Sequence, residues 1–124
     1  MEQNQTSKVD ISALQKLTGG DAAFELKYIN NFLVSVPQQL IHIKTALAQG
    51  DGKLLYSTLH MLKAQLAFYN ITGALDELKM VEQQLHLNPE ITEEVKKSAG
   101  FISKEITLAC NEFEKLKLNY PKVL

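Results

Sequence analysis

The residue best placed to carry out chemistry in this chain is His60. It lies in a stretch whose large apolar side chains recur every three or four residues, the spacing that places them along one side of an α-helix. Those side chains are Leu55, Leu59, Leu62, Leu66 and Tyr69. His60 is not one of them, so we expect its imidazole to face solvent. A neutral imidazole is nucleophilic near neutral pH, and it could therefore accept a group from a second protein.

The residues that share the expected helix face with His60 suit a phosphoryl group. Lys63 follows one helical turn later, close enough to attract a phosphoryl oxygen. The two alanines on this face keep the surface low, so that another protein could approach the imidazole closely. The neighbours of His60 on this face are Lys53, Tyr56, Lys63, Ala64 and Ala67. The alternative interpretation is a solvated face whose alanines only favour helix formation.

Other chemistries have weaker support in the sequence. Glu82 and His86 come nearest to a carboxylate–histidine metal motif, but they are spaced by four residues rather than three, and we expect both on the surface. A metal-binding helical enzyme is therefore the least favoured hypothesis. The glycines at 19–20 and 50–52 lack the Lys-Ser/Thr ending of a phosphate-binding loop, so ATP binding is not expected. Cys110, the only cysteine, is predicted to be a buried structural thiol.

Length and charge narrow the class of protein. A chain of 124 residues is long enough for one domain with a substantial core. The formal net charge is -1 and all 13 basic residues are lysines, which argues against a nucleic-acid partner. No apolar run approaches the ~18 residues of a membrane span, and the start of the chain lacks the features of a signal peptide. We therefore expect no membrane association and a cytoplasmic location.

Turn and capping residues divide the chain into helices. Residues 1–9 are polar and are expected to be flexible, whereas residues 10–120 are expected to form a single domain. Asp10 is expected to cap a short first helix that ends near Gly19. A long helix is expected from Asp21 to about residue 49, with a kink or a break at Pro37.

The second half of the chain predicts three more helices. The helix of His60 follows the turn at residues 50–52 and ends near Asn70, which readily takes a left-handed conformation. Thr72 is expected to cap the next helix, and Asn88-Pro89 to begin the last one. No stretch alternates in the manner of a β-strand. The expected fold is all-α: an antiparallel up-down four-helix bundle with a short extra N-terminal helix.

The run His60-Met61-Leu62-Lys63-Ala64 resembles the His-x-x-Lys-Gly signature of histidine-containing phosphotransfer (HPt) domains. The resemblance extends over roughly residues 10 to 117, nearly the whole chain. It departs from the family at Ala64, which replaces a glycine but keeps the position small. The family's second glycine corresponds either to Asn70 or to Gly73. Gln65 stands where a smaller residue is common, which could alter the choice of partner.

This resemblance implies a phosphorelay carrier. His60 would accept a phosphoryl group from the aspartyl phosphate of a response-regulator receiver domain or a hybrid sensor kinase, and pass it to another receiver aspartate. Lys63 would stabilise the phosphoryl charge. The docking surface would consist of Lys53, Tyr56, Ala64, Gln65 and Ala67. The chain would act as a monomer and bind no cofactor, with Mg²⁺ supplied by the receiver. The alternative is a four-helix adaptor, a degenerate HPt domain that docks a receiver without taking the phosphoryl group.

Overall fold

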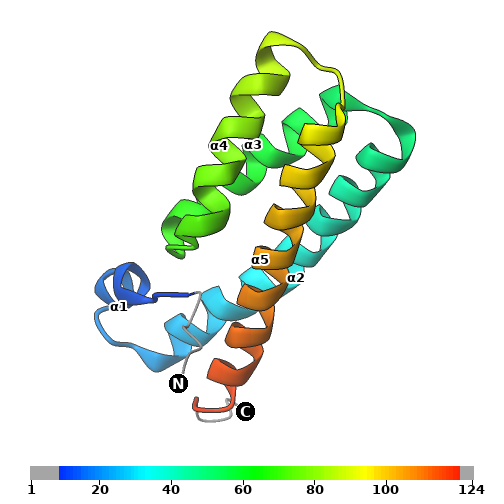
Figure 1. Cartoon of the computed structure of the whole chain (residues 1–124). Helices are drawn as coiled ribbons and strands as arrows, with labels where there is room; N and C mark the ends of the chain where they lie inside the picture. Colours follow the sequence, from blue (N-terminus) through cyan, green and yellow to red (C-terminus); the bar gives the residue numbers. More distant parts are fainter. Residues whose placement is uncertain (1–8, 121–124) are drawn as a thin grey trace, which may run out of the picture.

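Five α-helices make up most of residues 9–120, the part of the chain that the computed structural model describes (Figure 1). They are α1 (Ser12–Thr18), α2 (Ala22–Gln49), α3 (Gly52–Phe68), α4 (Thr72–Leu87) and α5 (Glu93–Lys117). No strand occurs in the described part of the chain, so the prediction of an all-α protein is confirmed. The predicted flexible segment 1–9 lies outside the described residues except for Val9, which packs against the core.

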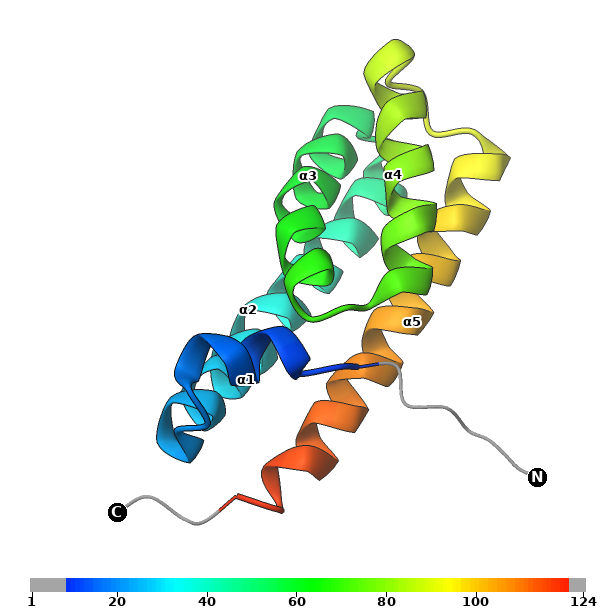
Figure 2. The same ribbon diagram turned by 90° about the vertical axis from the view of Figure 1, so that its left-hand side faces the viewer.

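The four longer helices surround a single core. α2 contacts α3, α3 contacts α4, α4 contacts α5, and α5 returns to contact α2, while α1 packs against α2. α3 and α4 form a hairpin, and α2 and α5 extend past the end of this hairpin towards α1 (Figure 2). The ring of Tyr69 lies against both Phe32 and Phe113, with centroid distances of 4.8 and 5.3 Å. This aromatic cluster fixes the end of the α3–α4 hairpin on the long helices.

The long second helix is continuous through Pro37. The Asp21 side chain accepts hydrogen bonds from two backbone N–H groups of the first turn, as its position in the sequence predicts. Phe32, Val36 and Ile43 are fully buried on either side of Pro37, so both halves of the helix share one buried face. Burying three large side chains outweighs the cost of about 3 kcal/mol for an interior proline. Of the two expectations for Pro37, a kink or a break, the break is wrong.

The helix of His60 begins and ends as the sequence predicts. The Asp51 side chain accepts a hydrogen bond from the backbone N–H of Leu54, and Asn70 takes a left-handed conformation with φ of 56° just after the helix. The start of the following helix, α4, differs from the prediction. Thr72 is the first residue of α4, and Ile71 occupies the capping position with no hydrogen bond from its side chain. Ile71 is almost fully buried, so core packing takes the place of a polar cap there.

The start of the last helix was predicted wrongly. α5 begins at Glu93, where the Thr92 hydroxyl accepts a hydrogen bond from the N–H of Val95. Asn88 instead ends α4, and Pro89 lies in the connection between the two helices. The Pro89 backbone packs so closely on Gly52 that a Cβ atom built at position 52 would lie 1.8 Å from the Pro89 carbonyl oxygen. This contact holds the connection against the start of α3. No helix within residues 9–120 has the length and apolar character needed to cross a membrane.

Candidate functional site

The imidazole of His60 faces solvent from the middle of α3. Its side chain is 61% exposed, whereas the neighbouring Leu59 and Leu62 are fully buried. The helix therefore directs these leucines into the core and turns His60 outwards, as the sequence predicts. An accessible imidazole on a rigid helix meets the first requirement for accepting a group from a partner protein.

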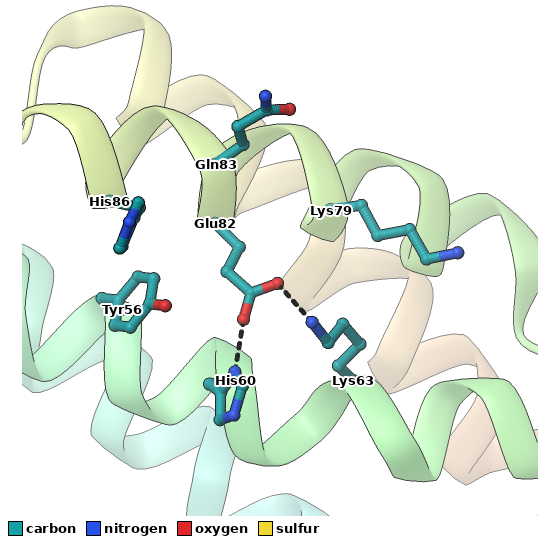
Figure 3. Close-up of a pocket in the computed structure, with 7 residues that line it drawn as sticks. All are labelled: Tyr56, His60, Lys63, Lys79, Glu82, Gln83 and His86. Carbon is teal, nitrogen blue, oxygen red and sulfur yellow. Dashed lines mark hydrogen bonds and ion pairs between the residues drawn. The ribbon is translucent and has the colours of Figure 1, made fainter.

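A carboxylate from α4 is hydrogen-bonded to one ring nitrogen of this imidazole (Figure 3). Glu82 Oε2 lies 2.6 Å from Nδ1 of His60, and Glu82 Oε1 lies 2.8 Å from Nζ of Lys63. The Glu82 side chain is only 10% exposed. Both partners reach across from α3 and converge on the two oxygens of a single carboxylate. The three residues form a His60–Glu82–Lys63 cluster that joins the two helices of the hairpin.

The expectation that Glu82 faces solvent is wrong. Leu78, Glu82 and Leu85 are spaced by four and three residues, and all three are buried. This is the same spacing that marks the core-facing side chains of a helix, so Glu82 occupies a position on the buried stripe of α4. A glutamate at such a position needs partners, because an unpaired buried charge is costly. The spacing was the available signal, and it pointed to a carboxylate directed at the neighbouring helix.

The cluster favours an ionised Glu82. Burial opposes ionisation, but the hydrogen bonds and positive charge of Lys63 and His60 together outweigh it and hold the pKa of Glu82 below its ordinary value. A carboxylate can only accept hydrogen bonds, so Nδ1 of His60 must carry the hydrogen. In a neutral imidazole the lone pair then lies on Nε2. No side chain within residues 9–120 is hydrogen-bonded to Nε2. The arrangement leaves a nucleophilic nitrogen facing solvent.

Tyr56, one turn before His60 on α3, packs against the imidazole. The Tyr56 ring stacks on His60 with a centroid distance of 6.0 Å and an interplanar angle of 15°. The other neighbour of Tyr56 is His86 of α4, at 5.9 Å between centroids. These groups surround a shallow hollow lined by Tyr56, His60, Lys63, Lys79, Glu82, Gln83 and His86 (Figure 3). The contribution of Lys79 to this hollow was not predicted from the sequence.

The structure separates the predicted docking residues into two groups. Lys53, Ala64 and Ala67 are exposed on α3, and Tyr56 is half-buried beside His60, so these residues share the face predicted for them. Gln65 turns away from this face. Its amide lies 3.4 Å from the hydroxyl of Ser35 on α2. Gln65 therefore belongs to the seam between α2 and α3.

Neither Cys110 nor the possible metal-binding side chains form a second site in the described part of the chain. Cys110 is half-buried on α5, where burial and, to a smaller extent, the charge of Glu114 raise the pKa of its thiol to about 11. Among residues 9–120, no three histidine, cysteine or acidic side chains come together in a way that could hold a metal ion. The Glu82 carboxylate is directed at His60 and Lys63.

No protein-family model, no curated protein and no solved structure matches this chain.

Proposed function

We propose that this protein is a phosphorelay carrier. His60 would take a phosphoryl group from the aspartyl phosphate of a response-regulator receiver domain and pass it to the aspartate of another receiver. The observation that carries the proposal is the state of the imidazole: it is 61% exposed, its Nδ1 is bound to a nearly buried carboxylate, and its Nε2 is open to a partner.

The geometry around His60 supports the following course for the transfer. Glu82 holds the Nδ1 hydrogen and keeps the ring from turning, so the Nε2 lone pair points outwards. That lone pair forms the nitrogen–phosphorus bond while the phosphorus–oxygen bond to the receiver aspartate breaks, and its electron pair returns to the aspartate carboxylate. Such transfers depend mainly on alignment and on stabilising charge. The receiver would supply Mg²⁺, and this chain would supply the nucleophile and its orientation.

Lys63 would give up its ion pair with Glu82 and then stabilise the negative charge of the phosphoryl group on His60. Its Nζ atom lies 2.8 Å from the Glu82 carboxylate, and its side chain is 38% exposed. A phosphoryl group with two negative charges on Nε2 would compete with one carboxylate for this ammonium group. Rotation of the long lysine side chain is enough for the exchange. The small side chains of Ala64 and Ala67 leave room for the receiver to reach Nε2.

We further propose that the chain acts as a monomer in the cytoplasm. We take the cyclic contacts among α2, α3, α4 and α5, together with the short α1, as an antiparallel up-down four-helix bundle with an extra N-terminal helix. One chain then supplies the full set of helices around the core, and dimerisation is not needed to build the site. Every residue of the His60–Glu82–Lys63 cluster comes from the α3–α4 hairpin of that chain.

The test is transfer from a phosphorylated receiver. Receivers from the same genome are phosphorylated and incubated with the protein, and the phosphate on this chain is then tested for lability in acid and stability in base. We expect wild type to become labelled, and His60→Gln to fold normally and remain unlabelled. His42→Gln, a change at an exposed helical histidine on α2, is the matched control and should be labelled at the normal rate. Labelling of His60→Gln at the wild-type level would refute the proposal.

A second candidate function is an adaptor that docks a receiver without accepting phosphate. It is favoured by one observation: Lys63 is already paired with Glu82 instead of being free to bind a phosphoryl group. The same experiment, with complex formation between receiver and protein measured alongside the phosphate, separates the two candidates. A receiver that forms a complex with this protein, but leaves no phosphate on His60, would support the adaptor.

A further inference from the structure

We propose that Glu82 controls how long phosphorylated His60 survives, by keeping a hydrogen on Nδ1 while the phosphoryl group is on Nε2. This inference rests on the proposed function, because it describes what happens after His60 has been phosphorylated. It assigns Glu82 a second role beyond orienting the free imidazole. Glu82 is a positioning residue in this scheme, because it acts on the phosphoryl group through the ring of His60.

The contact is suited to this role. Glu82 Oε2 lies 2.6 Å from Nδ1, slightly closer than the usual charge-assisted N–H···O hydrogen bond. The carboxylate comes from the buried stripe of α4, so the backbone of a second helix fixes its position. Its exposure of 10% shields the bond from water that would otherwise take the Nδ1 hydrogen. The opposite nitrogen carries the phosphoryl group into solvent, where it cannot disturb this contact.

The state of Nδ1 decides how readily the phosphoryl group leaves. When Nδ1 keeps its hydrogen, a phosphorylated ring is positively charged. Cleavage of the nitrogen–phosphorus bond then returns an electron pair to Nε2 and releases a neutral imidazole. The phosphorus meanwhile bonds to an oxygen of a receiver carboxylate, or to water. When Nδ1 has lost its hydrogen, the same cleavage would release an imidazole anion, which is a far poorer leaving group. A carboxylate beside Nδ1 therefore keeps the phosphoryl group ready for transfer and shortens its lifetime in water.

Other charged groups around the cluster do not replace Glu82. From α3, Lys63 approaches the other carboxylate oxygen, and Tyr56 stacks on the imidazole. From α4, Lys79 and His86 line the same hollow. Lysine and protonated histidine repel a positively charged ring, so they oppose retention of the Nδ1 hydrogen. Within the hollow, Glu82 is the group whose charge favours it.

Replacing the carboxylate by an amide isolates this charge. Glu82→Gln keeps the size of the side chain and an oxygen that can accept the Nδ1 hydrogen bond, but removes the negative charge. A hydrogen bond to a charged group is roughly twice as strong as a neutral one. We therefore expect phosphorylated Glu82→Gln to lose the Nδ1 hydrogen about one pH unit lower than phosphorylated wild type, a roughly tenfold higher proton concentration. The pH profile of dephosphorylation should move to lower pH. At pH 8 the phosphorylated variant should survive roughly tenfold longer than phosphorylated wild type.

Phosphoramidate, a small donor that phosphorylates accessible histidines, allows the test without a receiver. Wild type, Glu82→Gln and a control variant are phosphorylated, the donor is removed, and the loss of phosphate is followed by ³¹P NMR between pH 6 and pH 9. The matched control is Glu77→Gln, at another glutamate of α4 whose carboxylate bonds to Ser98 of α5 instead of to His60. The control should retain the wild-type profile, and the phosphorus should be on Nε2 in all three proteins.

A second variant tests the same idea in the opposite direction. Lys63→Gln removes a cation that lies close to the ring whether it pairs with Glu82 or with the phosphoryl group, and leaves the Glu82 contact with His60 in place. The Nδ1 hydrogen should then be retained to higher pH, so the profile should move to higher pH. This variant also provides a test if Glu82→Gln does not fold. A shift to lower pH in Lys63→Gln would overturn the inference.

The outcomes separate this inference from the proposed function. If His60 accepts phosphate neither from phosphoramidate nor from receivers, the proposed function fails, and this inference fails with it. If His60 is phosphorylated but the profiles of Glu82→Gln and wild type coincide, only the role of Glu82 is refuted. A longer-lived phosphohistidine in Glu82→Gln, with Glu77→Gln unchanged, supports both.

Discussion

Gly52→Ala should destabilise the protein even though alanine is the better helix former. Gly52 is the first residue of α3, and a Cβ atom at this position would lie 1.8 Å from the carbonyl oxygen and 2.6 Å from the carbonyl carbon of Pro89. An ordinary carbon–oxygen contact is about 3.3 Å, so the backbone near Pro89 would have to move by about 1.5 Å. The clash is with backbone atoms, which cannot turn aside as a flexible side chain can.

The magnitude follows from two opposing effects. Overpacking of a close contact costs about 1–3 kcal/mol, and a clash this severe with rigid backbone belongs at the upper end. Alanine recovers about 0.5–1 kcal/mol through its lower entropy in the unfolded chain. The net loss is about 2 kcal/mol of unfolding free energy. For a domain of this size the Tm should fall by roughly 6–10 °C.

Gly100→Ala is the matched control. Gly100 is also helical, in the interior of α5, and nothing lies within 4 Å of a Cβ atom built there. This change should therefore stabilise the protein by about 0.5–1 kcal/mol and raise the Tm by roughly 2–4 °C. Both variants are compared with wild type by thermal unfolding followed by circular dichroism and by urea titration. If Gly52→Ala unfolds at the same temperature as Gly100→Ala, the close contact with Pro89 does not constrain the protein.

Three further predictions concern the site and the thiol. Ala64→Leu should slow phosphoryl transfer from a receiver by more than about tenfold while the Tm changes by less than about 2 °C, since Ala64 is exposed and adds no core contact; normal transfer rates would remove the docking argument. The folded pKa of Glu82 is lowered, so its stabilising effect is complete above about pH 4.5 and is lost as the pH falls through the folded pKa. Wild type should accordingly exceed Glu82→Gln in unfolding free energy at pH 6, and a difference that grew between pH 4.5 and pH 3 would contradict this. Because the pKa of Cys110 is about 11, its reaction with iodoacetamide at pH 7.5 should be more than about tenfold slower in the folded protein than in urea, and equal rates would show an accessible thiolate.

Local signals in the sequence predicted most of the helical structure. Asp21 and Asn70 act at helix ends as their residue types predict, because capping depends on a few adjacent backbone groups. The prediction failed at Asn88-Pro89 and Thr92, where the chain offers two capping sequences within five residues. The choice between them involves the packing of Pro89 against Gly52, a contact between segments far apart in the sequence. Local residue preferences do not contain that information.

The candidate site was only half predictable for the same reason. His60 and Lys63 are one turn apart, so their shared face follows from helix geometry alone. Glu82 is 22 residues from His60, and their contact depends on how α3 and α4 are rotated against each other. The position of Gln65 depends on the rotation of α3 against α2, which places it beside Ser35. The sequence predicted the exposed histidine, but not the carboxylate that contacts it.

The groups that surround the imidazole come from one uninterrupted part of the chain. Tyr56 through His86 supplies every side chain of the hollow, while α2 and α5 contribute only the support beneath it. The side chains around the imidazole are thus encoded in one stretch of the gene, and the same stretch also supplies core residues such as Leu59 and Leu78 that pack towards the long helices. A helical hairpin could be exchanged for one with another set of surface residues, and a new partner recognised, without redesigning the two long helices on which it rests.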